Sequence, residues 1–185
     1  MKDSLQNSIW RIRDARIALI ARAVSTAGTA VTSIAAILLL HDSGTGPFVI
    51  AAFLAVMALP TIATMGIAGR VADTVDSRTV LTITALMQAL ACLVLGTFPV
   101  PITIFATGFL IALAQAFAQP SWQALVPRVV GEERIGSAIA WQQGLNSIAA
   151  PIGAALGGLL VSGSHVALGF WLDGASYLLL TLAAL

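Results

Sequence analysis

Residues Gly69–Arg78 read GRVADTVDSR and separate two long apolar runs. The stretch holds four of the charged residues in a 185-residue chain that has only nine basic and eight acidic side chains and is 58% hydrophobic. A water-soluble domain carries about 25 to 35% charged residues on its surface, whereas this whole chain is 9% charged. The composition therefore indicates a membrane protein in which GRVADTVDSR connects two membrane spans.

Six apolar runs are long enough, or nearly long enough, to cross a bilayer. A helix needs about 20 apolar residues to cross about 30 Å of hydrocarbon at about 1.5 Å per residue. The connections are short and rich in Gly, Pro, Ser and Asp, so consecutive helices are expected to be antiparallel. The sequence predicts an all-α membrane protein, a six-transmembrane-helix bundle (residues 17–185) that follows a cytoplasmic tail (residues 1–16). The expected helices cover residues 17–40, 48–68, 79–98, 102–119, 138–161 and 166–185.

All nine basic residues fall on one side of this topology. Five lie in or near the start of the first helix, two in the connection between the second and third helices, and two in that between the fourth and fifth. Positively charged connections stay in the cytoplasm, so the chain is expected to be a multi-pass protein of the cell inner (plasma) membrane with a cytoplasmic amino terminus. Because anchoring in the lipid bilayer accounts for these arginines, no nucleic acid is expected as a partner.

Within GRVADTVDSR, Gly69, Asp73 and Arg78 form a Gly-x-x-x-Asp pattern followed by a basic residue. This pattern resembles the signature between the second and third helices of the major facilitator superfamily, although Thr74 stands where a basic residue is usual. QPSWQALVPRVVGEERIGSAIAWQQGLNSIAAPIGAALGGLL (residues 119–160) and FWLDGASYLLL (residues 170–180) are similar to segments of its bacterial drug-efflux and siderophore-exporter branch.

The resemblance implies the amino-terminal six-helix half of a twelve-helix secondary transporter, an antiporter that exports a small amphipathic substrate by alternating access, with protons as the coupling ion. The residues Gly69, Asp73, Asp76 and Arg78 would then form a gate loop. The chain is expected to be an incomplete half whose partner is a missing carboxy-terminal half or a second copy. The alternatives are a solvated loop, a non-transporting six-helix scaffold, and a half-transporter that works as a homodimer.

The fifth predicted helix contains small residues at a spacing that suits close helix packing. Gly153 and Gly157 are four residues apart, Gly158 lies beside them, and Pro151 removes one backbone hydrogen bond and permits a bend. The run is similar to the Gly-Pro-rich fifth-helix motif of proton-coupled exporters. Ordinary tight packing explains it equally well.

Only two ionisable residues, Arg22 and Asp173, are expected deep inside the apolar runs, and such residues are functional candidates. Helix rise puts Arg22 about 8 Å from the cytoplasmic end and Asp173 about 10 Å from the outer end, too far apart for a salt bridge. Arg22 is either an ion-coupling residue or a side chain that extends to the lipid headgroups. Asp173 is protonated, hydrogen-bonded within the bundle, or exposed to water. In the resembling fold the sixth helix usually lies at the periphery of each half, which favours a structural role over substrate contact.

Uncharged polar residues could line a central cavity, because the first and fourth helices typically do so in the resembling fold. The alternative is hydrogen bonding between helices, worth about 0.6 to 2 kcal/mol per contact in membranes. The candidates are Ser25, Thr26, Thr29, Gln115, Gln142 and Asn146.

The sequence does not indicate an enzyme. Its two histidines lie at the edges of outer connections, and the HExxH, GxSxG and phosphate-binding patterns do not occur. The single cysteine, Cys92, lies in an apolar run and excludes an internal disulfide. No metal or cofactor is expected, and the partners are lipid, a small molecule and protons.

Overall fold

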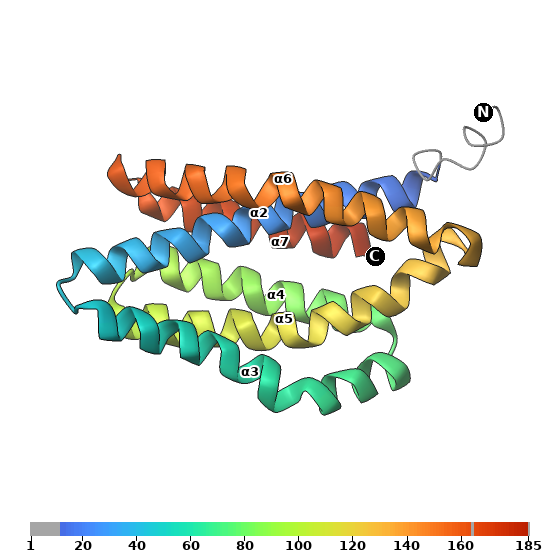
Figure 1. Ribbon diagram of the computed structural model, residues 1–185, viewed down its shortest axis with the longest axis horizontal. Helices are drawn as coiled ribbons and strands as arrows, with labels where there is room; N and C mark the ends of the chain where they lie inside the picture. Colours follow the sequence, from blue (N-terminus) through green and yellow to red (C-terminus); the bar gives the residue numbers. More distant parts are fainter. Residues whose placement is uncertain (1–11, 164, 185) are drawn as a thin grey trace.

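The computed structural model describes residues 12–163 and 165–184, which form long helices that lie along one axis (Figure 1). Consecutive helices run in opposite directions and are joined by short connections. The helices are α2 (Arg13–Asp42), α3 (Pro47–Thr74), α4 (Ser77–Thr97), α5 (Pro101–Val130), the short 3-10 helix η2 (Glu132–Arg134), α6 (Ile135–Ser162) and α7 (Val166–Ala184).

In the described part of the chain, the helices α2 to α5 and the stretch Glu132–Ser162 are long and apolar enough to cross a membrane. The stretch Val166–Thr181 of α7 is also apolar. The predicted all-α membrane fold is confirmed.

The observed helices extend beyond several of the expected bounds. α2 begins at Arg13, so residues 13–16 are not a tail, while residues 1–11 of the expected tail and Leu185 lie outside the described residues. α5 ends at Val130 instead of residue 119 and includes Pro120 and Pro127. Helices in membranes tolerate proline where neighbouring groups satisfy the backbone.

The stretch GRVADTVDSR is mostly helical, which corrects the expectation of a loop. Gly69 and Asp73 lie in the last turns of α3, Arg78 lies in the first turn of α4, and only Val75 and Asp76 connect the helices. Asp76 begins α4 as its N-cap, since its side chain accepts a hydrogen bond from the backbone N–H of Thr79 at 3.2 Å. The predicted gate loop is therefore a tight helical corner.

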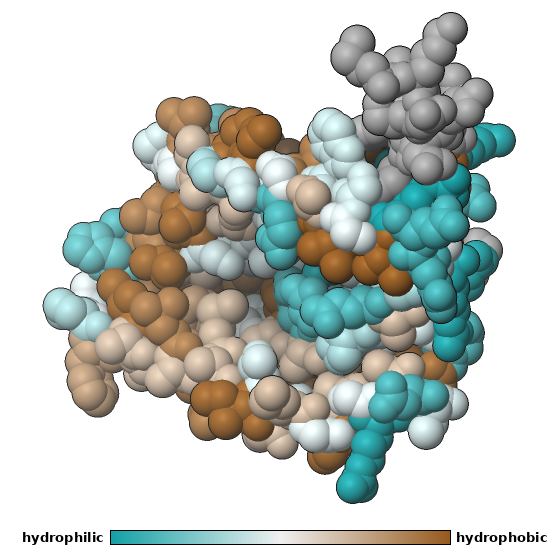
Figure 2. Space-filling view, turned by 45° about the vertical axis from the view of Figure 1, so that its right-hand side comes forward, coloured by the Kyte–Doolittle hydropathy of each residue, from teal (hydrophilic) through white to brown (hydrophobic). Residues whose placement is uncertain are grey.

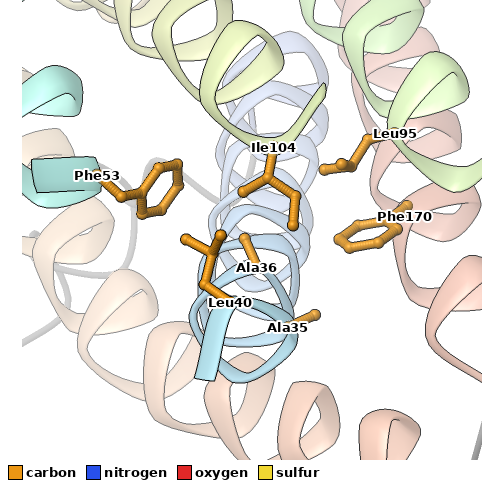
Figure 3. Close-up of a cluster of buried hydrophobic side chains, with 7 residues drawn as sticks. All are labelled: Ala35, Ala36, Leu40, Phe53, Leu95, Ile104 and Phe170. Carbon is orange, nitrogen blue, oxygen red and sulfur yellow. The ribbon is translucent and has the colours of Figure 1, made fainter. Parts of the chain in front are cut away.

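The helices pack mainly in the pairs α2–α6, α4–α7, α3–α5, α4–α5 and α2–α7. Where the helices approach the end of the bundle that holds the α2–α3 connection, five of them share an apolar core (Figure 3). Its buried side chains are Ala35, Ala36, Leu40, Phe53, Leu95, Ile104 and Phe170. This core fixes the five helices relative to one another at that end.

Two glycines of the predicted packing motif lie at the α2–α6 interface. A Cβ on Gly153 would overlap the Ala27 carbonyl group, and one on Gly157 would lie 2.8 Å from the Val31 carbonyl oxygen. A Cβ on Gly158 would meet nothing within 4 Å, and Pro151 is exposed. Therefore only Gly153 and Gly157, which are four residues apart, allow the backbones of α2 and α6 to approach closely.

Charged side chains gather at one end of the bundle, as Figure 2 shows on the right, where the α3–α4 and α5–α6 connections lie. Apolar side chains cover much of the remaining surface in this view. The exposed charged residues at this end are Arg13, Asp14, Arg16, Arg70, Asp73, Asp76, Arg78, Arg128, Glu132 and Glu133. The asymmetry in the sequence is thus an asymmetry of the folded molecule.

Candidate functional site

Arg22 lies on α2 in the half of the bundle nearer the charged end, and its side chain is only 8% exposed. Its guanidinium carbon lies 5.8 Å from the centre of the Trp122 ring of α5, within the range of a cation–π interaction. Because the side chain is buried over this ring, the structure does not show it extending to the headgroups.

Trp122 is held in place by a second contact. Its indole Nε1–H donates a hydrogen bond to Oε1 of Gln142 on α6 at 2.8 Å. One turn further along α6, Asn146 accepts a hydrogen bond from the Thr26 hydroxyl of α2 at 3.1 Å. Three helices, α2, α5 and α6, therefore meet through polar contacts at the level of Arg22.

Asp173 lies on α7 at a different level and is 1% exposed. Its Oδ2 accepts a hydrogen bond from the Thr32 hydroxyl of α2 at 2.6 Å and one from the Cys92 thiol of α4 at 3.5 Å. Its Oδ1 accepts from the Ser176 hydroxyl at 3.3 Å. A Cβ on Gly28 would overlap Oδ1, so the absence of a side chain there lets α2 approach the carboxyl group. Asp173 is thus hydrogen-bonded within the bundle.

The Tyr177 hydroxyl lies between these two levels. It is 2.7 Å from the Thr29 hydroxyl of α2, and the Gln115 side chain of α5 lies near it. Ser25 is buried on α2, and its backbone carbonyl accepts a hydrogen bond from the Thr29 hydroxyl at 2.9 Å. Polar groups therefore follow α2 from the level of Arg22 to that of Asp173.

Most of the residues that the sequence offered as cavity candidates connect neighbouring helices. Thr26, Thr29, Gln142 and Asn146 all take part in hydrogen bonds between helices, which is the alternative that the sequence left open. Such bonds hold a membrane bundle together and do not by themselves make a substrate path.

The residues of the helical corner lie apart from both polar levels, at the charged end. The Asp73 carboxylate is exposed and makes no hydrogen bond or ion pair with another described residue. A Cβ on Gly69 would meet nothing within 4 Å, so none of the described helices approaches it closely. Asp76 caps α4, as described above, and Arg78 is exposed on that helix.

Several residues of these two levels were not among the sequence candidates: Gly28, Thr32, Trp122, Ser176 and Tyr177. Helical spacing contains part of the missing signal. Thr32 lies at helical spacing from Ser25 and Thr29 and therefore on the same face of α2. Tyr177 follows Asp173 by four residues and therefore shares its face of α7. Trp122 carries no comparable signal, because its role depends on which neighbour its ring meets.

Chemically, the site offers a buried cation, a buried carboxyl group and neutral hydrogen-bonding groups. Among residues 12–163 and 165–184, no three His, Cys, Asp or Glu side chains lie together as metal ligands would. The arrangement can bind charged or polar groups in an apolar setting.

Comparison with known proteins indicates the family of this chain. A family model described as Major Facilitator Superfamily matches residues 18–185, nearly the whole chain. A comparison with curated proteins finds no match. Since the match covers α3 to α7 and all but the first residues of α2, and the members of this family carry molecules across membranes, the chain belongs to the major facilitator superfamily and is a multi-pass membrane transport protein.

Proposed function

We propose that this chain forms one half of a secondary active exporter that expels a small amphipathic molecule in exchange for protons. The resemblance of three segments to the drug-efflux and siderophore-exporter branch supports export. The gathering of charged side chains at one end supports a cytoplasmic location for that end and for the amino terminus, in the inner membrane.

The observation that carries the proposal is the buried carboxyl group of Asp173. It is the one carboxyl group buried within the described helices, and its partners there are hydroxyl and thiol groups, not a cation. Ionisable residues inside a membrane are costly and mark ion or proton pathways by default. A carboxyl group without a paired cation can take up a proton without leaving an unpaired positive charge.

Two helices leave large faces for other partners. In α3 and in the stretch Glu132–Ser162, only 11% of the most apolar 18-residue window is buried, compared with 56% in α4. Lipid, a second six-helix half or a second copy of the chain could cover these faces. The proposed exporter requires one of the last two, because alternating access needs two units that move against each other.

In this proposal the exposed carboxylate of Asp73 acts as a gate residue. It lies at the carboxyl end of α3, where the helix dipole disfavours a negative charge. A contact with the other unit in one conformation would offset this cost and stabilise that conformation. Gly69, four residues earlier with open space above it, would allow that unit to approach.

The test is transport into inverted membrane vesicles that contain the protein and its second unit. We expect at least one of three probes, cationic rhodamine 6G, neutral Nile red or anionic pyrenebutyrate, to accumulate when the lumen is acidic. Asp173→Asn should abolish the dependence on the proton gradient, whereas Asp42→Asn, at an exposed acid, should not. Accumulation that a protonophore leaves unchanged, or equal behaviour of the two variants, would contradict the proposal.

A further inference from the structure

Arg22 has no counter-charge among the described residues. Its Nε is buried without a hydrogen-bond partner, and no ion pair joins its guanidinium to a described carboxylate. Asp173 contacts α2 at Thr32, ten residues beyond Arg22, which corresponds to about 15 Å along the helix. Asp14 is eight residues away in the other direction, about 12 Å, and is exposed. The buried carboxyl group and the buried cation therefore cannot neutralise each other.

A buried guanidinium without a counter-charge is costly, because it loses its hydration and gains no paired anion in return. The cation–π contact with the Trp122 ring offsets part of this cost. The N–H groups of the guanidinium remain available, and they suit a carboxylate, sulfonate or phosphate group. The site is electrostatically incomplete until an anion arrives.

A small apolar pocket of about 20 Å³, with room for about one water molecule, lies beside the Trp122 ring that Arg22 contacts. Its walls come from α2, α5 and α6 and include Ala18, Leu19, Val126 and Ala138, and the Trp122 ring forms part of the wall. Because Gln142 fixes the indole by its hydrogen bond, the ring presents one face to the guanidinium in a defined orientation. The Trp122 side chain thus contacts the Arg22 cation and also forms part of the apolar wall of the pocket.

We propose that Arg22 and Trp122 bind the acidic group of an amphipathic organic anion, whose apolar part contacts the apolar side chains around the Trp122 ring. This names the substrate class of the proposed exporter and depends on that function only for the transport step. A cationic substrate would be repelled at this position, because the described residues offer no buried carboxylate near Arg22. An anionic lipid headgroup has the same chemistry, and the experiment separates the two.

The experiment measures binding, not transport. The full chain is reconstituted in phosphatidylcholine nanodiscs, and energy transfer from its tryptophans to pyrenebutyrate is compared with that to the matched cation pyrenebutyltrimethylammonium. We expect saturable binding of the anion that is at least about tenfold tighter than that of the cation, as a hydrogen-bonded charge contact provides.

Two variants with the same change in net charge locate the site. Arg22→Gln should weaken pyrenebutyrate binding at least about tenfold. Arg128→Gln, at an exposed arginine near the same end of the bundle, should leave it within about twofold, because solvated charges are screened. Arg22→Lys retains the charge and should bind with intermediate affinity.

Three results would overturn the inference: equal affinity for the anion and the cation, equal losses in the two glutamine variants, or displacement of pyrenebutyrate when phosphatidylglycerol replaces part of the lipid. The last would assign Arg22 to lipid. Failure of gradient-driven transport would leave the binding result standing, so the inference and the proposed function can fail separately.

Discussion

The α2–α6 interface should depend on the absence of a side chain at Gly153, and a matched pair of variants measures this dependence. A Cβ at Gly153 would lie 2.8 Å from the carbonyl carbon and 2.9 Å from the Cα of Ala27, compared with about 3.5 to 4.0 Å for an ordinary carbon contact. Gly158, on the same helix, has open space at the corresponding position.

Both variants, Gly153→Ala and Gly158→Ala, gain the same helix propensity of about 1 kcal/mol, so this gain cancels in their comparison. Overpacking costs about 1 to 3 kcal/mol, and the upper part of this range applies because the obstacle is backbone and not a flexible side chain. Gly153→Ala should therefore be less stable than Gly158→Ala by about 2 to 3 kcal/mol.

The assay is unfolding in mixed micelles of mild detergent and dodecyl sulfate, followed by circular dichroism. The unfolding midpoint of Gly153→Ala should fall below that of Gly158→Ala at unchanged slope, since slope reports the surface exposed. Equal midpoints, or a more stable Gly153→Ala, would refute the close α2–α6 packing.

Three further outcomes test other parts of the bundle. Thr32→Val removes the shortest hydrogen bond to the buried carboxyl group of α7 and should lower the free energy of unfolding by about 0.6 to 1.7 kcal/mol in the same micelle assay; no change would show that this bond contributes nothing. Asp73→Asn should reduce transport at unchanged abundance, whereas Asp76→Asn should do much less because asparagine also caps helices, and equal losses would remove the gate role. A cysteine at Glu133 should react with an impermeant maleimide only from the cytoplasm and one at Thr45 only from outside, because both positions are exposed at opposite ends; the reverse pattern would invert the topology.

Hydropathy predicted the helical architecture well, because the length of an apolar run sets the number of spans directly. It failed at α5, which was expected to end at residue 119 but continues to Val130. It also failed at GRVADTVDSR, where charge suggested a loop although six of its residues, Gly69 to Thr74, continue α3. Local composition does not show how much of a polar connection is helical.

The site was predicted only in part. Arg22 and Asp173 stand out in any apolar sequence because charge is rare there. Their partners depend on how the helices are rotated against one another, which a single sequence does not specify. The sequence therefore does not distinguish Trp122 from other apolar residues or Thr32 from other small polar residues. The packing of the helices shows that Trp122 contacts Arg22 and that Thr32 donates a hydrogen bond to Asp173.

The proposed exchange of substrate for protons can be measured directly in liposomes. The protein with its second unit is placed in liposomes loaded with a probe that it transports and with the pH indicator pyranine, and the liposomes are then diluted. Loss of the probe should acidify the lumen, and Asp173→Asn should abolish that acidification. Probe leaving with no change in luminal pH, or with the lumen turning alkaline, would contradict the account.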